Sequence, residues 1–230
     1  MYIVTDESSF YDRWSRPYDV FASNPVVDSW REEAVQTIDP DPADVVVEMG
    51  CGSGANFTHL REAVGDNGRV IGLDLSEGIL THARERVVEN GWDNVDVIRA
   101  DATNPPIEEV DVIFSSFVTG MFHSPRRVVE NWCTLISDEG KVGILDVAKS
   151  DHDASPLINA GLDAFTGLTA SGPSFKGKLE WTLEGNPLAE LTSDVEAGHG
   201  VIKRQATDVE TTQFGLDSVH LTVGRFEDED

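Results

Sequence analysis

Short apolar runs alternate with segments of helical periodicity through the middle of the chain. The run Val45-Val46-Val47 is continuous, as expected of a strand buried on both faces. We predict five strands here, at residues 45–47, 69–75, 95–100, 110–117 and 141–147. Helices are expected after Gly54, from the N-cap Ser76 to Asn90, and over 125–136. This repeated alternation indicates an α/β fold with a parallel, doubly wound sheet.

The two ends of the chain have a different pattern. Residues 7–38 are predicted to be mostly helical, divided by Pro17 and Pro25. After Ser150 we expect a helix, a loop, a short helix and two β-rich runs, at residues 154–170, 171–185, 187–196, 201–214 and 218–226. Because the last two runs flank a short turn with a glycine, Gly215-Leu216-Asp217, they form a hairpin and must be antiparallel.

The charge of the chain is strongly negative. Its 42 acidic and 17 basic residues give a formal net charge of -25, which disfavours a nucleic-acid-binding protein because phosphates need clustered lysine and arginine. Of the bases, 12 are arginine and 5 are lysine. Such surfaces resemble those of proteins from salt-accumulating halophiles, in which molar salt screens the repulsion. The alternative is an ordinary acidic protein.

The cysteines and the apolar stretches of the chain indicate its cellular compartment. Cys51 and Cys133 are the only cysteines, so neither a disulfide framework nor a metal site is indicated, and we expect a cytoplasmic protein. The N-terminal segment lacks the apolar stretch that a signal peptide has, so we do not expect it to be one. The most apolar stretch, 110–122, is too short to span a bilayer.

Three groups of residues follow the first three predicted strands. Glu48-Met49-Gly50-Cys51-Gly52-Ser53-Gly54 can form a tight turn that lets backbone approach a ligand. Asp74 can accept hydrogen bonds from two ribose hydroxyls, and Asp101 with Ala102 can meet an adenine. Without a ligand these would be a βα turn, a capping Asp and a turn Asp. Because the loop has no lysine or arginine, it favours a cationic nucleoside over a pyrophosphate.

At these residues the chain resembles the class I S-adenosylmethionine-dependent methyltransferases. The loop matches the acid-x-Gly-x-Gly-x-Gly motif of that family, Asp74 its ribose-binding acid and Asp101 its adenine-side acid. The resemblance implies a Rossmann-like seven-stranded sheet of order 3-2-1-4-5-7-6 with strand 7 antiparallel. It also implies S-adenosylmethionine as cofactor, with the methionine end at Glu48. The expected cofactor-binding residues are Tyr18, Glu48, Gly50, Cys51, Gly52, Gly54, Asp74, Leu75, Asp101, Ala102 and Ser116.

Within this class, Tyr11-Asp12-Arg13-Trp14 and the segment 75–80 resemble the branch of quinone C-methyltransferases and phosphatidylethanolamine N-methyltransferases. The resemblance implies a small-molecule acceptor such as a quinone or another apolar metabolite. The candidates for a general base are His123 and Tyr18. Two other functions stay open: a non-catalytic S-adenosylmethionine-binding protein, and an NAD(P)-dependent oxidoreductase, which would share Gly50-x-Gly52-x-x-Ala55.

The length suits a single domain, and we expect the whole chain, 1–230, to form one. It divides into an N-terminal helical lid, a cofactor-binding core, an insert over the acceptor site, and a helix with the terminal hairpin, at residues 1–40, 41–150, 151–185 and 186–226. Which of the lid and the insert closes the site, the identity of the acceptor and the oligomeric state stay open.

Overall fold

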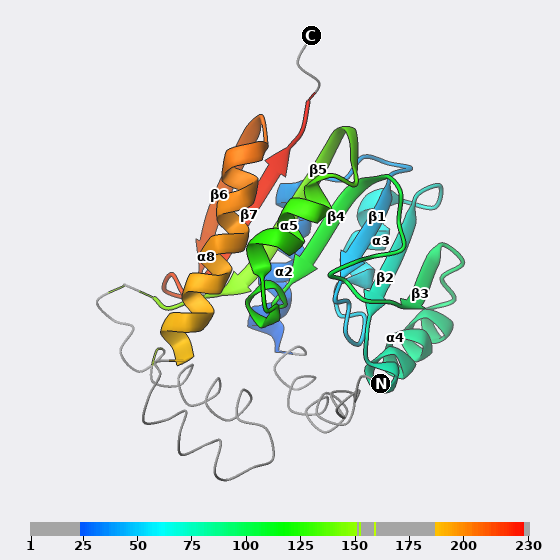
Figure 1. Ribbon diagram of the computed structural model, residues 1–230. Coiled ribbons are helices and arrows are strands. Elements are labelled where there is room, and N and C mark those ends of the chain that lie inside the picture. Colours follow the sequence, from blue (N-terminus) through cyan, green and yellow to red (C-terminus); the bar gives the residue numbers. More distant parts are fainter. Residues whose placement is uncertain (1–23, 151, 153–158, 160–186, 228–230) are drawn as a thin grey trace, which may run out of the picture.

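The fold is centred on a seven-stranded mixed sheet (Figure 1). The computed structural model describes residues 24–150, 152, 159 and 187–227. The strands are β1 Val45–Met49, β2 Arg69–Asp74, β3 Val95–Arg99, β4 Val110–Ser116, β5 Ile136–Val147, β6 Asp208–Phe214 and β7 Val219–Arg225. Their order is β3-β2-β1-β4-β5-β7-β6. Strands β1 to β5 are parallel, and β7 is antiparallel to both β5 and β6. The predicted α/β class, strand order and antiparallel hairpin are confirmed.

Helices cover both faces of the sheet (Figure 1). One apolar cluster joins the sheet to three helices: α2 Pro25–Ile38, α3 Phe57–Val64 and α4 Glu77–Asn90. A second cluster joins the opposite face to α5 Pro125–Cys133 and α8 Pro187–Gln205. A short 3-10 helix, η1 Thr119–Met121, follows β4 and lies against α8. The parallel strands are therefore buried on both sides, as their continuous apolar sequence predicts.

The ends of helix α4 follow from capping residues. The Ser76 hydroxyl accepts a hydrogen bond from the backbone N–H of Ile79, and Gly91 ends the helix in the left-handed conformation, with φ of 65°. Both features satisfy backbone groups that a helix terminus leaves unpaired. The predicted bounds of this helix are confirmed, and α4 begins at Glu77, three residues after Asp74, the last residue of β2.

The predicted boundary between the helix and the strand within residues 187–214 is wrong. A short helix over 187–196 and a strand from 201 were expected, but α8 continues to Gln205 and β6 begins at Asp208. Gly198 does not end the helix. A Cβ atom there would lie 3.4 Å from a methyl group of Val129 in α5, which is an ordinary van der Waals contact, so the helix continues past this glycine packed against α5. Val201 and Ile202, predicted to be strand residues, are buried in the second apolar cluster.

The boundary between α5 and β5 also differs from the prediction. The helix ends at Cys133 instead of residue 136, and the strand begins at Ile136 instead of residue 141. Ile136 pairs with Val110, and the register shifts before Lys141 pairs with Val112. The irregular pairing explains why the sequence around Gly140 indicates a break, although the strand passes through it.

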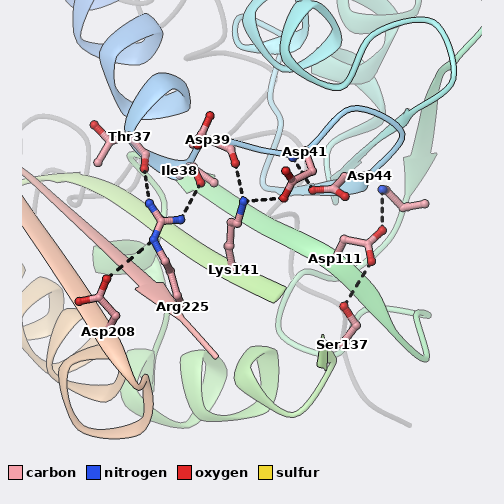
Figure 2. Close-up of polar contacts among 11 residues, drawn as sticks. Thr37, Ile38, Asp39, Asp41, Asp44, Asp111, Ser137, Lys141, Asp208 and Arg225 are labelled. Atoms are coloured by element: carbon pink, nitrogen blue, oxygen red, sulfur yellow. Dashed lines mark hydrogen bonds and ion pairs between the residues drawn. The ribbon is translucent and has the colours of Figure 1, made fainter. Parts of the chain in front are cut away.

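Basic side chains anchor the C-terminal end of α2 to the sheet (Figure 2). Arg225 of β7 donates to the backbone oxygens of Ile38 and Thr37, at 3.4 and 3.3 Å. Lys141 of β5 donates to the backbone oxygen of Asp39 and binds the carboxylate of Asp41 at 3.0 Å. Cations are favoured at this end of a helix because the last carbonyls lack partners and carry partial negative charge. Helix α2 is thus fixed in position relative to the strands.

The expected lid and insert lie mostly outside the described residues. Of segment 1–40 the structure describes residues from 24 onwards, in which the buried face of α2 packs against the sheet. Of segment 151–185 it describes residues 152 and 159. Tyr18 and, apart from residue 159, the helix predicted at 154–170 therefore lie outside the described residues. Among those described, no helix is long and apolar enough to cross a bilayer.

Candidate functional site

The loop after β1 folds tightly against β2. The backbone N–H groups of Gly50 and Cys51 both donate to the carbonyl of Leu73, at 2.8 and 2.9 Å. Gly50 has a φ of 74°, and a Cβ atom there would lie 2.7 Å from a methyl group of Val118. A side chain at this position would therefore force Val118 away from the loop. The predicted strand-to-helix turn is present, with its backbone close to the segment that follows β4.

Asp74 connects this loop to the start of α4. One carboxylate oxygen accepts from the N–H of Gly52 at 3.0 Å, and the other accepts from the N–H of Ser76 at 2.9 Å. Burial raises the pKa of Asp74, and these backbone hydrogen bonds oppose the rise. Asp74 therefore has a structural role, which is the alternative to ribose binding that the sequence left open. Since each carboxylate oxygen has further acceptor capacity, the contacts are compatible with binding ribose hydroxyls.

Glu48 is a fully buried acid at the carboxyl end of β1. The amide nitrogen of Asn56 donates to one of its oxygens, Oε1, and also to the hydroxyl of Ser116 at 2.9 Å. Among the described residues, the other oxygen, Oε2, has no hydrogen-bond partner. Burial raises the pKa of Glu48 to about 8, although the hydrogen bond from Asn56 lowers it. The site thus holds an acid that lacks a donor for one oxygen.

Asp101 and Ala102 form a turn after β3 that α5 holds in place. One oxygen of Asp101 accepts from the N–H and the hydroxyl of Thr103, at 2.8 and 2.7 Å, as in the turn anticipated as an alternative. The indole N–H of Trp132 donates to the carbonyl of Ala102 at 2.7 Å. Beside β3, Leu75 is 51% exposed, which gives the end of β2 an apolar surface on which a purine could stack.

A buried polar network holds η1 beside the loop. The hydroxyl of Thr119 donates to Asp146 at the end of β5. His199 of α8 lies 3.6 Å from Asp146, and its other ring nitrogen is 2.8 Å from the hydroxyl of Thr222. All four side chains are buried. The network fixes the segment in which Val118 contacts Gly50.

Two further residues named from the sequence, His123 and Cys51, lie in different environments. His123 is exposed. Burial and the charge of Glu190 raise the pKa of Asp194 in α8, and the charge of His123 opposes this rise. Cys51 is a buried free thiol whose pKa burial raises well above its usual value. It therefore packs within the loop and does not have the properties of a nucleophile.

Sequence reasoning missed several residues that shape this site, notably Asn56, Trp132 and Arg31. Asn56 lies just before α3 and binds Glu48 and Ser116, on two different strands. Trp132 reaches the turn after β3 from α5. No local motif marks either contact. For Arg31 a signal exists, because it shares the buried face of α2 with Val27 and Ala34.

Comparison with known proteins identifies the class of fold. Residues 46–140 match the family model described as methyltransferase domain. A solved structure of an S-adenosylmethionine-dependent methyltransferase from Aquifex aeolicus superposes with a TM-score of 0.61 at 20% identity, covering 85% of this chain and 89% of that one. The described chain therefore has the α/β methyltransferase fold, and its core is similar in sequence to methyltransferase domains.

Two curated relatives make the comparison more specific. A demethylmenaquinone methyltransferase from Shouchella clausii is 28% identical over 123 residues, which are 53% of this chain and 52% of the relative. An arsenite methyltransferase from Halobacterium salinarum is 29% identical over 111 residues, 47% of this chain and 28% of the relative. The chain thus matches about half of the first relative and less of the second.

The site fits S-adenosylmethionine. The oxygen of Glu48 without a partner suits the ammonium group at the methionine end, since a buried acceptor favours a donor. Asp74 suits the ribose, and Leu75 with the turn at Asp101 suits the adenine. When bound, the cofactor supplies a methyl group activated by its positively charged sulfur. Among the described residues, no cluster of acids, histidines and cysteines forms a metal site.

We expect Glu48→Gln to stabilise the protein without ligand while weakening its binding of S-adenosylhomocysteine. The folded-state pKa of about 8 exceeds the reference value of 4.5, so the folded state retains a proton that the unfolded state loses. The free energy of unfolding of the wild type should therefore fall from about pH 4.5 through pH 8. The variant should lack this fall and be a few kcal/mol more stable at pH 8.

The measurement is denaturant unfolding at a series of pH values, with calorimetric titration of S-adenosylhomocysteine. Glu62→Gln, at an exposed position in α3, is the matched control and should change neither quantity. A Glu48→Gln protein that is less stable at pH 8, or that binds as tightly as wild type, would contradict the role assigned to Glu48.

Asp74→Ala should reduce both stability and ligand affinity. The carboxylate accepts from two backbone N–H groups, so its loss should lower the free energy of unfolding by about 1–3 kcal/mol. Loss of the ribose contacts should lower the affinity for S-adenosylhomocysteine roughly tenfold or more. An analogue without the two ribose hydroxyls should lose less affinity. If stability falls but both ligands keep their affinities, Asp74 is a structural residue alone.

Proposed function

We propose that the protein transfers a methyl group from S-adenosylmethionine to a small apolar acceptor. The observation that carries the proposal is Glu48, a fully buried acid with one oxygen lacking a hydrogen-bond partner among the described residues. It lies at the carboxyl end of β1, where open α/β sheets bind ligands. The match of residues 46–140 to the methyltransferase-domain model supports the same reaction.

The chain's residues have a limited task in such a reaction, because the methyl group is already activated in the cofactor. They bind the cofactor in one orientation, exclude water and hold the acceptor in line with the sulfur–methyl bond. Glu48 and Asp74 fix two ends of the cofactor. Ser116, at the end of β4, shares the amide of Asn56 with Glu48, and we expect it to lie where the acceptor meets the methyl group.

The acceptor we favour is an aromatic, apolar molecule of the quinone class. The demethylmenaquinone methyltransferases among the relatives support it, at 25 to 29% identity. An exposed apolar side chain after β4 also supports an apolar acceptor: Met121 in η1 is 53% exposed. Arsenite is less favoured, although one relative acts on it by name. Burial raises the pKa of Cys133 to about 12 and that of Cys51 well above its usual value, which opposes the thiolates that arsenic binds.

Two other functions account for fewer of the observations. An oxidoreductase would place a pyrophosphate at the loop, but the loop from Gly50 to Gly54 has no lysine or arginine to bind it, and an acid, Glu48, precedes it. A non-catalytic binding protein would use the same residues for the cofactor and would lack the reaction. Measurement of methyl transfer distinguishes it from an enzyme.

We further propose that the protein works in a salt-rich cytoplasm. The 42 acidic residues against 5 lysines support adaptation to high salt, because a charge of this size repels itself unless it is screened. A relative from Halobacterium salinarum supports it as well. Cys51 and Cys133 are free thiols in the described residues, as is usual in a reducing compartment.

The proposed function predicts binding of S-adenosylmethionine and S-adenosylhomocysteine in calorimetry at about 3 M KCl, a concentration at which acidic surfaces are screened. NAD should not bind. With methyl-labelled cofactor and a demethylated naphthoquinol, the label should transfer to the acceptor, and the Glu48→Gln variant should transfer much less. Tight binding of NAD without binding of the methyl donor would overturn the proposal. Binding without transfer to any of naphthoquinol, phosphatidylethanolamine and arsenite would favour a non-catalytic protein.

Salt dependence tests the proposed adaptation. The melting temperature should be higher at about 3 M KCl than at about 0.1 M, because the Debye length falls from about 10 Å to below about 3 Å and the acidic surface repels itself less. Thermal melting followed by circular dichroism measures the difference. A melting temperature that stays constant or falls as salt is added would contradict halophilic adaptation.

A further inference from the structure

Trp132 is a fully buried side chain of α5 that takes no direct part in the proposed reaction. Its indole N–H donates to the carbonyl of Ala102 at 2.7 Å, and this hydrogen bond is itself buried. The ring of Phe122, just after η1, meets the indole edge-on, with the ring centres 5.8 Å apart and an angle of 84° between the planes. Packing therefore holds the indole in one orientation, with its polar group against the turn after β3.

The turn that receives this bond consists of residues 101–104. The N–H of Asn104 donates to the carbonyl of Asp101 at 3.0 Å, which closes the turn. The N–H of Ala100 donates to the carbonyl of Asp74 at 3.0 Å, which ties the start of the turn to β2. These backbone bonds fix the two ends. The orientation of the central peptide unit is a separate matter, since the type I and type II forms of a four-residue turn differ by a rotation of that unit.

Two side chains fix this central peptide unit, which joins Ala102 to Thr103. Trp132 binds its carbonyl. Its N–H donates to Oδ1 of Asp101 at 2.8 Å, and the same oxygen accepts from the Thr103 hydroxyl at 2.7 Å. A rotation that broke the bond to the indole would also turn the N–H away from Asp101, because a peptide unit is planar. The indole and the Asp101 carboxylate are thus coupled through one peptide plane.

Both hydrogen bonds that the Asp101 carboxylate accepts from described residues use Oδ1, and Asp101 is exposed, so Oδ2 can accept from a ligand. Resting on the proposed function, we propose that Trp132 is a positioning residue for recognition of the adenine base. By fixing the central peptide unit, it fixes the direction in which Asp101 presents Oδ2 to the amino group of the base. A carbonyl in place of that amino group would be repelled by the carboxylate.

A tryptophan with a purely structural role would also need a partner for its N–H, because buried polar groups are hydrogen-bonded. The two roles differ in their consequences for ligands. Loss of packing around Trp132 lowers stability and should change the affinity for all ligands of the site alike. Loss of the donor should instead change the ratio of the affinities for two ligands that differ at the amino group of the base.

The test compares S-adenosylhomocysteine with S-inosylhomocysteine, in which a carbonyl replaces the amino group, by calorimetry in molar salt. Wild type should bind the adenine ligand roughly tenfold or more tightly, because a hydrogen bond to a charged acceptor is lost with the amino group. Trp132→Phe keeps an aromatic ring without the donor, so its two affinities should agree to within about threefold. Trp30→Phe is the matched control, since Trp30 stacks with Phe214 on the other face of the sheet, and it should keep the wild-type ratio.

Trp132→His separates the donor from the packing. A neutral histidine can place its Nε2–H where the indole N–H lies, because the two nitrogens occupy the same position of a five-membered ring relative to Cβ. The smaller side chain leaves a cavity, so this variant should be less stable than Trp132→Phe. It should nevertheless keep most of the preference for the adenine ligand. Thermal melting in the same buffer shows that each variant is folded and ranks their stabilities.

Two results would overturn the assignment to Trp132. One is a wild-type ratio near one, and the other is a folded Trp132→Phe protein that keeps the wild-type preference. If neither Trp132 variant folds, Phe122→Ala, at a half-buried position, frees the indole and should lower the ratio, and an unchanged ratio would then overturn the assignment. None of these results affects the proposed function, provided that S-adenosylhomocysteine binds. Failure of the wild type to bind S-adenosylhomocysteine at all would instead overturn the proposed function.

Discussion

Burial of the Glu48 carboxyl group is the constraint around which the candidate site is arranged. A protein interior disfavours a charged acid unless hydrogen bonds or an opposite charge compensate it, and here one oxygen has a donor while the other has none among the described residues. Such an arrangement costs stability, and its retention in the fold is understandable if a ligand completes it. Asn56 and Ser116 link the acid to β4, so the ends of two neighbouring strands are tied to one group.

The central part of the fold could be predicted from the sequence because its signals are local. Continuous apolar runs indicate buried parallel strands, and Ser76 and Gly91 mark the ends of α4 by capping chemistry. The strand order came from the family resemblance, and the sheet confirms it. The start of β6 was misplaced because Val201 and Ile202 have the composition of a strand but are buried by a helix that continues past Gly198.

The arrangement of the candidate site could be predicted only in part. The glycine loop and Asp74 belong to short motifs whose local geometry requires those residue types. The hydrogen-bond partner of Glu48, Asn56, comes instead from the residue before α3, which also binds Ser116 at the end of another strand. The periodicity of α2 does place Arg31 among buried positions.

The most direct test of the central claim is a crystal structure of the protein with S-adenosylhomocysteine, grown in molar salt. The account predicts that the amino group of the ligand lies within hydrogen-bond distance of Oε2 of Glu48. It also predicts that the ribose hydroxyls meet Asp74. A ligand bound elsewhere, or one whose amino group points away from Glu48 while the acid stays buried, would contradict it.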